Sequence, residues 1–480
     1  MARGALWMVA MRWAIRLIGL VNTAIIARLL SPTDFGLVAL AMIAVDLIVT
    51  MTDGDIEMAL VRAPEAPAGL LHTGWTLKVM AGIIVWAVVT ALAGPVAASF
   101  GDERIAQILR IAALRPLILG FESIGIIQFR RTLRFAAEFR YLVAQRLLTF
   151  VSGIALVLAF RDYTALAWSM PVSALVAVGL SYAIAPGMPR PSLQCWRQFW
   201  HFSRWQMLFN TARLVGERCD PLVISKVGSV AETGIYVVGF DLAMMPAREI
   251  MLPAGRALMP AYARIAHDPK ALASSFHGVL GFAAIIAGAT GAGMSAIAEP
   301  AVLLLLGEQW RAAIPFVRWL GIFAALEGLW LMLDPVLIAS GRERILAISN
   351  LAFAGLTVPA ITVAALLLGT GAIPAARIAV MLVVLAGILS RILAWRWITP
   401  AAMAAALWRP VAAALAMSAT IAWLHPIIGP SSPITAIGLD IVLGAVTYPV
   451  VLLALWRLSG GGDGAERTLV DLAFARWNHQ

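Results

Sequence analysis

The residues with the most evident chemistry are charged groups inside long apolar segments. Four polar residues of one segment follow one another at steps of four, three and four positions: Asp46, Thr50, Asp53 and Glu57. Such steps place side chains on one face of a helix. A carboxylate inside a helix bundle can bind a proton or cation, and its occupancy can differ between two conformations of the bundle. The stripe therefore predicts an ion-responsive site, with Asp46 as its candidate.

A second segment carries both signs of charge on one face. Asn210, Arg213, Glu217 and Asp220 lie at steps of three, four and three, and Arg218 is adjacent to this stripe. Guanidinium groups bind phosphate-type oxygens through charge-assisted, often bidentate hydrogen bonds. We therefore predict that Arg213 and Arg218 contact an anionic ligand. Glu217 and Asp220 are further candidates for the ion-responsive role.

Two more apolar segments contain charges of the same kind. Arg12 and Arg16 are four positions apart in the first segment, and Asp241 and Arg248 are seven apart in another, with Pro246 between them. A charge that faces lipid at mid-bilayer costs at least about 2.5–3.5 kcal/mol, so these groups should face the protein interior or a water-filled cavity. Arg12, Arg16 and Arg248 complete the predicted anion-binding set, and Asp241 completes the ion-responsive set.

A purely structural role is the alternative for each of these residues. Arg213 could pair with Glu217, or Arg248 with Asp241, and such pairs would only pin helices together. The repeated occurrence of charges on four related segments favours a functional role.

Weaker signals lie elsewhere in the chain. Glu327 and Asp334 are seven positions apart on one face of a later segment. Several arginines lie near segment ends and are expected to snorkel to the membrane interface. These are Arg110, Arg115, Arg318, Arg377 and Arg391.

The elements that position these groups are predicted to be membrane-spanning helices. Hydrophobic residues make up 61% of the 480 and charged residues only 13%, and a bilayer crossing needs roughly 20 apolar residues. Loops between the apolar segments are too short for a soluble domain. The predicted spans are 5–27, 36–60, 76–99, 105–127, 141–160, 164–185, 205–226, 234–256, 278–306, 313–338, 346–368, 373–395, 408–425 and 435–456. The fold class is therefore all-α, a polytopic membrane protein with about 14 transmembrane helices.

The basic residues predict the orientation of the spans. The net charge is +10, but the basic residues are spread over loops, so nucleic-acid binding is not expected. About nineteen lie on one side of the predicted spans, and five on the other, namely Arg28, Arg104, Arg161, Lys226 and Arg311. The positive-inside rule then places both termini in the cytoplasm.

The two halves of the chain resemble each other. Arg16-Leu17-Ile18-Gly19 recurs as Arg213-Leu214-Val215-Gly216, and Asp34-Phe35-Gly36 recurs as Glu232-Thr233-Gly234. The copies are an even number of spans apart, as in transporters whose two parallel halves rock around a substrate. We predict an N-lobe over 1–188, a C-lobe over 205–398 and two added helices over 399–458.

Two short amphipathic stretches are predicted at the cytoplasmic membrane surface. A linker helix over 189–204 combines tryptophans with arginines, and the tail over 459–480 contains an apolar flank between Glu466 and Trp477. Basic and aromatic helices of this kind lie among lipid headgroups. The alternative for these stretches is a surface helix or a linker that joins two bundles.

Motifs for enzyme chemistry are missing from the sequence. We find no phosphate-binding glycine loop, no zinc spacing and no serine elbow. Cys195 and Cys219 have no partners for a metal site, and a disulfide between them is not expected. No cofactor and no enzyme activity are therefore predicted.

Three strings resemble the Wzx-type polysaccharide flippases of the multidrug/oligosaccharidyl-lipid/polysaccharide exporter superfamily. They are Ala27-Arg28-Leu29-Leu30-Ser31-Pro32-Thr33-Asp34-Phe35-Gly36, then Gln128-Phe129-Arg130-Arg131-Thr132-Leu133-Arg134-Phe135, and Thr233-Gly234-Ile235-Tyr236 running to Met244-Met245-Pro246. The first is fairly specific, and the likeness in layout covers nearly the whole chain.

This resemblance implies a bacterial inner-membrane protein with two six-helix lobes around a cationic cavity, plus two further helices. It implies a substrate as well, an undecaprenyl-pyrophosphate-linked oligosaccharide that passes from the cytoplasmic to the periplasmic leaflet. The expected partners are this substrate, membrane lipids and a polysaccharide polymerase, and the protein is expected to act as a monomer. The family has no short catalytic signature, so individual site residues transfer poorly.

Other functions remain as alternatives. A drug or cation antiporter of the same superfamily would prefer an acidic, aromatic cavity, whereas the spans here are rich in arginine. A lipid II flippase is compatible with the charge pattern. A membrane-embedded glycan polymerase or glycosyltransferase would carry a large periplasmic loop, and no predicted outer loop is long enough. The sugar repeat, the energy source and the exported product are not specified by the sequence.

Overall fold

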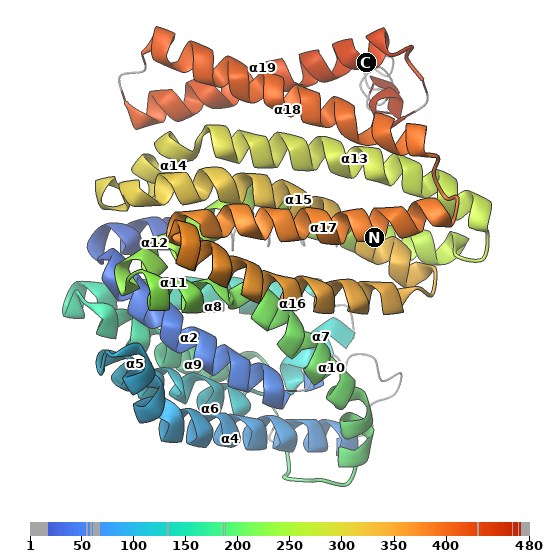
Figure 1. The fold of residues 1–480 in the computed structure, drawn as a ribbon. Coiled ribbons are helices and arrows are strands. Elements are labelled where there is room, and N and C mark those ends of the chain that lie inside the picture. Colours follow the sequence, from blue (N-terminus) through green and yellow to red (C-terminus); the bar gives the residue numbers. More distant parts are fainter. Residues whose placement is uncertain are drawn as a thin grey trace. The chain divides into compact units, whose positions relative to one another are not determined.

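The computed structural model describes residues 18–53, 56–57, 60, 68–131, 134–185, 187, 189–429, 432–462, 464–468 and 470–471. Over these residues the chain is helical and contains no β-strand (Figure 1). Ten described helices are long and apolar enough to cross a membrane. The predicted fold class, an all-α polytopic membrane protein, is confirmed.

The chain divides into two compact units, Met1–Ile235 and Tyr236–Gln480. The long or membrane-embedded helices of the first unit are α2 (Pro32–Asp53), α4 (Ala68–Phe100), α8 (Phe135–Phe160), α9 (Tyr163–Ile184) and α10 (Trp196–Arg218). Shorter helices complete this unit: Ile18–Leu29, α5 (Arg104–Ala112), α6 (Leu114–Gly120), α7 (Gly125–Arg131) and α11 (Asp220–Val227). Helix α12 (Val230–Ile265) begins in the first unit and continues into the second.

The second unit contains the remaining helices. They are α13 (Pro269–Ala296), α14 (Ala298–Leu305), η1 (Glu308–Ala313), α15 (Ile314–Ala339), α16 (Glu343–Leu368), η2 (Thr370–Ala372), α17 (Ile373–Ala394), α18 (Pro400–Ile428) and α19 (Pro433–Leu458). Helices α13 and α15 approach closely, because Gly321 and Gly291 face each other and a Cβ on Gly321 would lie 2.9 Å from the Gly291 carbonyl oxygen. Small residues permit such approach in membrane bundles.

Four of the predicted spans do not correspond to one of the ten long apolar helices. The first is described only from Ile18 onward. The fourth is broken into α5, α6 and α7, and the seventh is broken at Cys219 between α10 and α11. The eighth lies within α12, which continues through Pro246. The charged stripe around Arg213 thus crosses the break between α10 and α11, whereas Asp46 and Thr50 lie within the long helix α2.

The segment predicted as a separate linker helix, 189–204, is not a separate helix. Its second half, from Trp196, forms the first turns of α10, and this helix runs on into the seventh span. Helix α10 packs along α2, so the seventh span groups with the first unit, and the unit boundary falls inside α12. The predicted division into two six-helix lobes stays a prediction.

The repeated string around Asp34 and Glu232 has a local structural cause. Ser31 Oγ donates to Asp34 Oδ2 at 2.6 Å, and the Asp34 amide donates back to Ser31 Oγ. In the same way, the Glu232 amide donates to Ser229 Oγ at 3.1 Å. Both contacts belong to the cap at a helix start, at α2 and at α12, where free backbone N–H groups need acceptors. The repeat therefore includes a capping motif.

The glycines of the same repeat lie against each other. A Cβ on Gly234 would be 1.9 Å from the Pro32 carbonyl oxygen and 2.7 Å from the Gly36 nitrogen. A Cβ on Gly36 would be 1.9 Å from the Val230 carbonyl oxygen. Only glycine permits backbones to approach this closely. The starts of α2 and α12 are therefore held in backbone contact.

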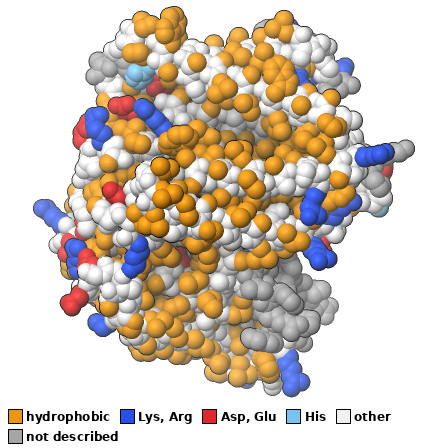
Figure 2. Space-filling model, in the orientation of Figure 1, with side chains coloured by type: hydrophobic (Ala, Val, Ile, Leu, Met, Phe, Trp, Pro, Cys, Tyr) orange, Lys and Arg blue, Asp and Glu red, His pale blue; other side chains and the backbone are white. Residues whose placement is uncertain are grey.

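The outer surfaces of the helices are apolar, as Figure 2 shows for one face of the molecule. Leu366, Leu367 and Leu368 are 67–78% exposed, and Val383, Leu415 and Trp423 are exposed as well. Contiguous apolar surface of this kind needs a lipid environment. The exposure therefore agrees with membrane insertion.

The beginning of the C-terminal tail packs on the second unit. Ala465 and Glu466 are buried, and Glu466 Oε1 lies 3.3 Å from Arg409 Nη1 of α18. The Ala465 side chain fills the space beside Gly281 of α13. This part of the tail was expected among lipid headgroups, and it packs on helices instead because its carboxylate finds a buried guanidinium. Residues 472–480 lie outside the described part of the chain.

Candidate functional site

Asp46 of α2 lies in the electrostatic field of two arginines from other helices of the first unit. Its side chain is partly buried, and the charges that act on its carboxylate are those of Arg115 on α6 and Arg218 on α10. Asp46 and Arg218 were both predicted as site residues, whereas Arg115 was expected to snorkel to the membrane interface.

Arg213 and Glu217 form an ion pair on α10. Arg213 Nε donates to Glu217 Oε1 at 2.7 Å, and the two residues are one helical turn apart. The pairing that the sequence offered as a structural alternative is therefore present. The Arg213 side chain is nevertheless 51% exposed. A guanidinium has five N–H donors, so one carboxylate does not use its full capacity.

Asp220 lies at the break between α10 and α11. It is 1% exposed and is the first residue of α11, and Pro221 follows it. Cys219 Sγ donates to Asp220 Oδ1 at 3.8 Å. The N-terminus of a helix stabilises a carboxylate through its free N–H groups and its dipole. The break in the seventh span thus explains how a charged group can be buried there.

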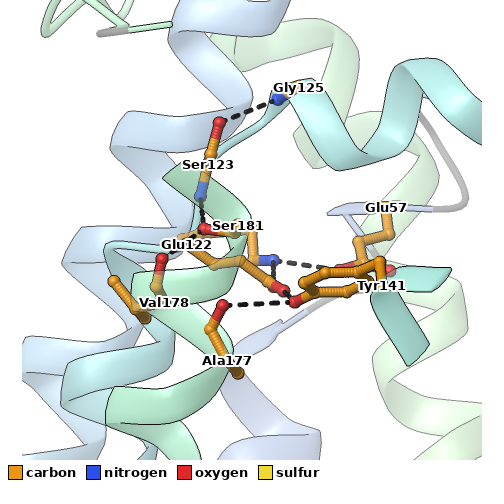
Figure 3. Close-up of polar contacts among 9 residues, drawn as sticks. Glu57, Glu122, Ser123, Gly125, Tyr141, Ala177, Val178 and Ser181 are labelled. Carbon is orange, nitrogen blue, oxygen red and sulfur yellow. Dashed lines mark hydrogen bonds and ion pairs between the residues drawn. The ribbon is translucent and has the colours of Figure 1, made fainter. Parts of the chain in front are cut away.

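A second polar cluster of the first unit surrounds Lys78 (Figure 3). Lys78 Nζ of α4 lies 3.0 Å from Glu57 Oε1 and 3.5 Å from Glu122 Oε2. The Tyr141 hydroxyl group of α8 donates to Glu122 Oε1 at 2.5 Å. Lys78 and Glu122 are 15% and 18% exposed, and Glu57 is 42% exposed. The cluster lines a cavity of about 220 Å³ together with Thr52.

Hydrogen bonds between helices hold Glu122 in place. The Ser123 amide donates to Ser181 Oγ of α9 at 2.9 Å (Figure 3). Ser123 Oγ donates to the Ala185 carbonyl oxygen at 2.8 Å. These bonds satisfy polar groups at the break between α6 and α7, where the helical ladder is interrupted. The carboxylate of Glu122 is therefore positioned by the fourth, fifth and sixth predicted spans together.

The sequence analysis did not identify the Lys78 cluster. Glu57 was placed on the Asp46 stripe, and Glu122 and Tyr141 received no role. One signal was available, since the basic residues are almost all arginine and lysine occurs only at 78, 226 and 270. The partners of Lys78 come from segments 21 and 44 residues away, so spacing could not show them.

The second unit has its own charged cluster. Arg248 Nη2 of α12 lies 2.7 Å from Glu327 Oε1 of α15, and its guanidinium lies 5.6 Å from the Phe240 ring centre. Pairing of Arg248 with Asp241 was the structural alternative from the sequence, and the structure shows an ion pair with Glu327. Asp241 is exposed and lies two helical turns from Arg248 along α12, whereas Glu327 reaches Arg248 from α15.

Arg377 is buried in the same unit. It is 1% exposed, and its guanidinium lies within 4.7–5.5 Å of the ring centres of Phe240, Phe323 and Phe353. The expectation that Arg377 snorkels to an interface is wrong. Aromatic rings attract a guanidinium through their quadrupole and so permit its burial.

Polar groups of the last helices line a larger cavity of about 350 Å³. His425 Nδ1 lies 2.8 Å from Asp440 Oδ1, and Glu299 lies 3.3 Å from Arg318. Asp440 is buried on α19. None of these residues was predicted as a site.

The outcome for the predicted site residues differs between them. Arg12 and Arg16 lie outside the described residues. The charge of Arg218 acts on the Asp46 carboxylate, Arg213 is paired with Glu217, and Arg248 is paired outside the predicted set. The roles of all nine residues in binding or ion coupling stay predictions. Among the described residues, no group of three or more His, Cys, Asp or Glu side chains could hold a metal ion.

Comparison with known proteins identifies the family. A family described as polysaccharide biosynthesis protein matches residues 25–315 of the chain. The succinoglycan biosynthesis transport protein ExoT of Rhizobium meliloti (strain 1021) is 26% identical over 313 residues, 64% of this chain and 62% of ExoT. The lipopolysaccharide biosynthesis protein WzxC of Escherichia coli (strain K12) is 21% identical over 75% of this chain and 74% of WzxC. The alignment thus spans less than two thirds of ExoT.

Solved structures share the fold. The lipid II flippase MurJ in an inward closed conformation has a TM-score of 0.73 at 10% identity, over 95% of this chain and 99% of MurJ. An inward-facing multidrug resistance transporter of the MATE family has a TM-score of 0.63 at 13% identity, over 80% of this chain and 95% of that protein. At these identities the likeness establishes the fold alone.

ExoT is named as a transport protein, and the prediction that this chain is not an enzyme agrees with that name. The resemblance to polysaccharide transporters of the Wzx type is confirmed as well, because the family match covers more than half of the chain. This protein belongs to the polysaccharide biosynthesis protein family and is a multi-pass membrane protein of that family.

Proposed function

We propose that this protein translocates an undecaprenyl-pyrophosphate-linked oligosaccharide from the cytoplasmic to the periplasmic leaflet of the bacterial inner membrane. The observation that carries the proposal is the family match over residues 25–315, supported by relatives named for succinoglycan transport and for lipopolysaccharide biosynthesis. The exported glycan becomes exopolysaccharide, capsule or O-antigen. Translocation proceeds by alternating access, in which the substrate site opens to one leaflet at a time.

Arginines inside the spans bind the pyrophosphate in this mechanism. Arg213 and Arg218 both lie on α10, and the Arg213 side chain is half exposed. Arg248 contributes from the second unit, and Arg12 and Arg16 from the first span. Guanidiniums suit this role because they match phosphate oxygens in pairs and remain charged away from water.

Carboxylates couple the movement to an ion gradient. Asp46, Glu217, Asp220 and Asp241 are the candidates. A carboxylate can drive alternating access only if its affinity for a proton or cation differs between the two conformations. Asp46 fits this requirement, since the guanidiniums of Arg115 and Arg218 act on it and a bound pyrophosphate would compete for them.

The proposal includes an orientation and partners. Both termini lie in the cytoplasm by the positive-inside rule. The protein acts as a monomer and delivers its substrate to a polysaccharide polymerase at the outer leaflet.

Translocation in reconstituted vesicles tests the assignment. The probe is a fluorescent undecaprenyl-pyrophosphate-linked oligosaccharide, whose exposure on the outer leaflet is followed by a lectin or an impermeant quencher. Arg213→Ala, Arg218→Ala and Arg16→Ala are each expected to lower the rate at least tenfold. Arg457→Ala, at the exposed end of α19, is the control and should translocate at the wild-type rate. Wild-type rates in all three variants would contradict the anion-binding role, and transport of lipid II or of a drug cation instead would contradict the substrate.

A further inference from the structure

An apolar groove runs along the outside of α16 and α17 in the second unit. It encloses about 200 Å³. Its lining residues are Ile345, Ile348, Ser349, Ala352 and Leu356 on α16, and Val383, Val384, Gly387 and Arg391 on α17. The groove exists because small residues meet in its middle, and a Cβ on Gly387 would meet no atom within 4 Å.

The groove runs along two antiparallel helices. Helices α16 and α17 are joined by the short η2 turn, so the start of α16 and the end of α17 lie at the same end of the groove. From Ile345 to Leu356 the groove extends about 16 Å at 1.5 Å per residue. Its walls are apolar and face outward, because Leu356 and Val383 are exposed. Figure 2 shows this hydrophobic surface over α16 and α17.

One end of the groove is cationic. Arg391 is exposed there, and no described carboxylate forms an ion pair with it; the same holds for Arg344 at the start of α16. The Arg342 guanidinium beside them lies 3.7 Å and 4.6 Å from the ring centres of Trp395 and Trp397. Tryptophan and arginine mark the headgroup level of a membrane, and the bias of basic residues assigns this end to the cytoplasmic side.

The hydroxyl group of Ser349 lies deeper in the groove than its cationic end. Ser349 is 8% exposed, lines the groove, and forms no hydrogen bond through its side chain to another described residue. Serines in helices usually bond to a carbonyl oxygen of the preceding turn. Ser349 is one turn of α16 beyond Ile345, which is the first lining residue of that helix, so its hydroxyl group lies just inside the cationic end of the groove. The ester carbonyl groups of a glycerophospholipid likewise lie just inside its phosphate.

We propose that this groove binds one anionic glycerophospholipid of the cytoplasmic leaflet. Its phosphate contacts Arg391 and Arg344, the Ser349 hydroxyl group donates to an ester carbonyl oxygen, and one acyl chain lies over Gly387 and Ala352 toward Leu356. A polyprenyl phosphate has no ester carbonyl group and leaves Ser349 without a partner. The site is therefore distinct from the proposed substrate-binding arginines.

Native mass spectrometry of the purified full-length protein tests this site. The probes are phosphatidylglycerol and phosphatidylcholine with identical acyl chains, added at equal concentration. The wild type should retain phosphatidylglycerol at least tenfold better. Gly387→Leu fills the groove and should lower retention of both lipids at least tenfold, and Arg391→Gln should abolish the preference for phosphatidylglycerol. Ser349→Ala should lower retention severalfold.

Matched controls separate this site from general effects. Gly438→Leu adds the same side chain to an open, exposed position of α19, and Arg457→Gln removes a similar exposed charge. Both should retain lipid as the wild type does. Equal retention of the two phospholipids by the wild type, or unchanged retention in Gly387→Leu, would overturn the proposal. Displacement of phosphatidylglycerol by undecaprenyl phosphate in the wild type would also overturn it. Retention requires no translocation, so this result is independent of the proposed function.

Discussion

Replacement of Lys78 by methionine should destabilise the first unit while leaving the packing volume nearly unchanged. Lys78 Nζ lies 3.0 Å from Glu57 and 3.5 Å from Glu122. Removing one member of a fully buried ion pair costs about 3–5 kcal/mol, because it leaves an uncompensated charge. The two carboxylates of this cluster differ in exposure, so their ion pairs with Lys78 should contribute unequally to the free energy of unfolding.

The magnitude follows from that difference. Glu57 is 42% exposed, and water can replace the ammonium group beside it. The ion pair between Lys78 and Glu57 should therefore contribute less than about 1 kcal/mol. Glu122 is only 18% exposed, but it keeps the hydrogen bond from Tyr141. A hydrogen bond to a charged group is worth about 1.5–3 kcal/mol, which offsets part of the loss. We expect Lys78→Met to lower the free energy of unfolding by about 2–3 kcal/mol, roughly a 30- to 150-fold change in the equilibrium constant.

The assay is reversible unfolding in mixed micelles of dodecyl maltoside and sodium dodecyl sulfate, followed by tryptophan fluorescence. Lys226→Met is the matched control, because Lys226 is exposed and contacts the Ser99 carbonyl oxygen and the Phe100 ring instead of a carboxylate. It should change the free energy of unfolding by less than about 1 kcal/mol. The double variant Lys78→Met/Glu122→Gln removes the unpaired charge and should be more stable than Lys78→Met alone.

Two results would refute this reasoning. If Lys78→Met unfolds at the wild-type midpoint, the ammonium group contributes no net stability and the pair is solvated. If Glu57→Gln is as destabilising as Glu122→Gln, the exposure of each carboxylate does not determine how much its ion pair with Lys78 contributes.

Three further predictions concern the backbone contact, the tail and acid stability. Gly234→Ala places a Cβ 1.9 Å from the Pro32 carbonyl oxygen and should destabilise the fold by about 1–3 kcal/mol or more in the same unfolding assay. Gly179→Ala is the control, because no atom lies within 4 Å of its new Cβ, and it should not destabilise the fold. Glu466→Gln should release the tail from Arg409 and raise hydrogen exchange at 464–468, whereas Asp471→Asn on the exposed face of the tail should leave exchange unchanged. Hydrogen bonds from Arg104 lower the pKa of Asp102 from its usual 3.8, so this contact should stabilise the fold above that pH and be lost as the pH falls through the lowered pKa. Asp102→Asn should therefore reduce the loss of unfolding free energy at acid pH by less than about 1 kcal/mol. If the unfolding free energy of the variant depends on pH as that of the wild type does, this contribution is excluded.

Apolar segment lengths and charge spacing predicted the class of this protein, and the family match agrees. Ten of the predicted spans correspond to described helices of sufficient length and apolarity. Of the remaining four, the fourth and the seventh are broken, and the seventh is the span that the spacing of Arg213 and Asp220 singled out, whereas Asp46 lies on the long helix α2. The lengths of the apolar segments predict these spans because a helix that faces lipid must be continuous and apolar wherever no polar group is needed.

Side-chain partners were less predictable. Arg213 and Glu217 share one helical turn, so their pairing follows from spacing alone. Arg248 pairs with Glu327, which is 79 positions away on another helix, so spacing along one helix could not show this pair. Arg377 was expected at the interface, yet three phenylalanines from other helices make its burial possible.

The sequence by itself determined that the chain crosses a membrane repeatedly, which helix faces carry charge, and how the halves repeat, because these properties depend on neighbours within one or two helical turns. Only the tertiary structure decided that Lys78 joins Glu57 and Glu122, that Glu466 is buried against Arg409, and that Ser349 and Arg391 share a groove. Those contacts depend on which helices pack together. In a chain whose helices are nearly all apolar outside, hydrophobic pattern cannot distinguish one packing partner from another.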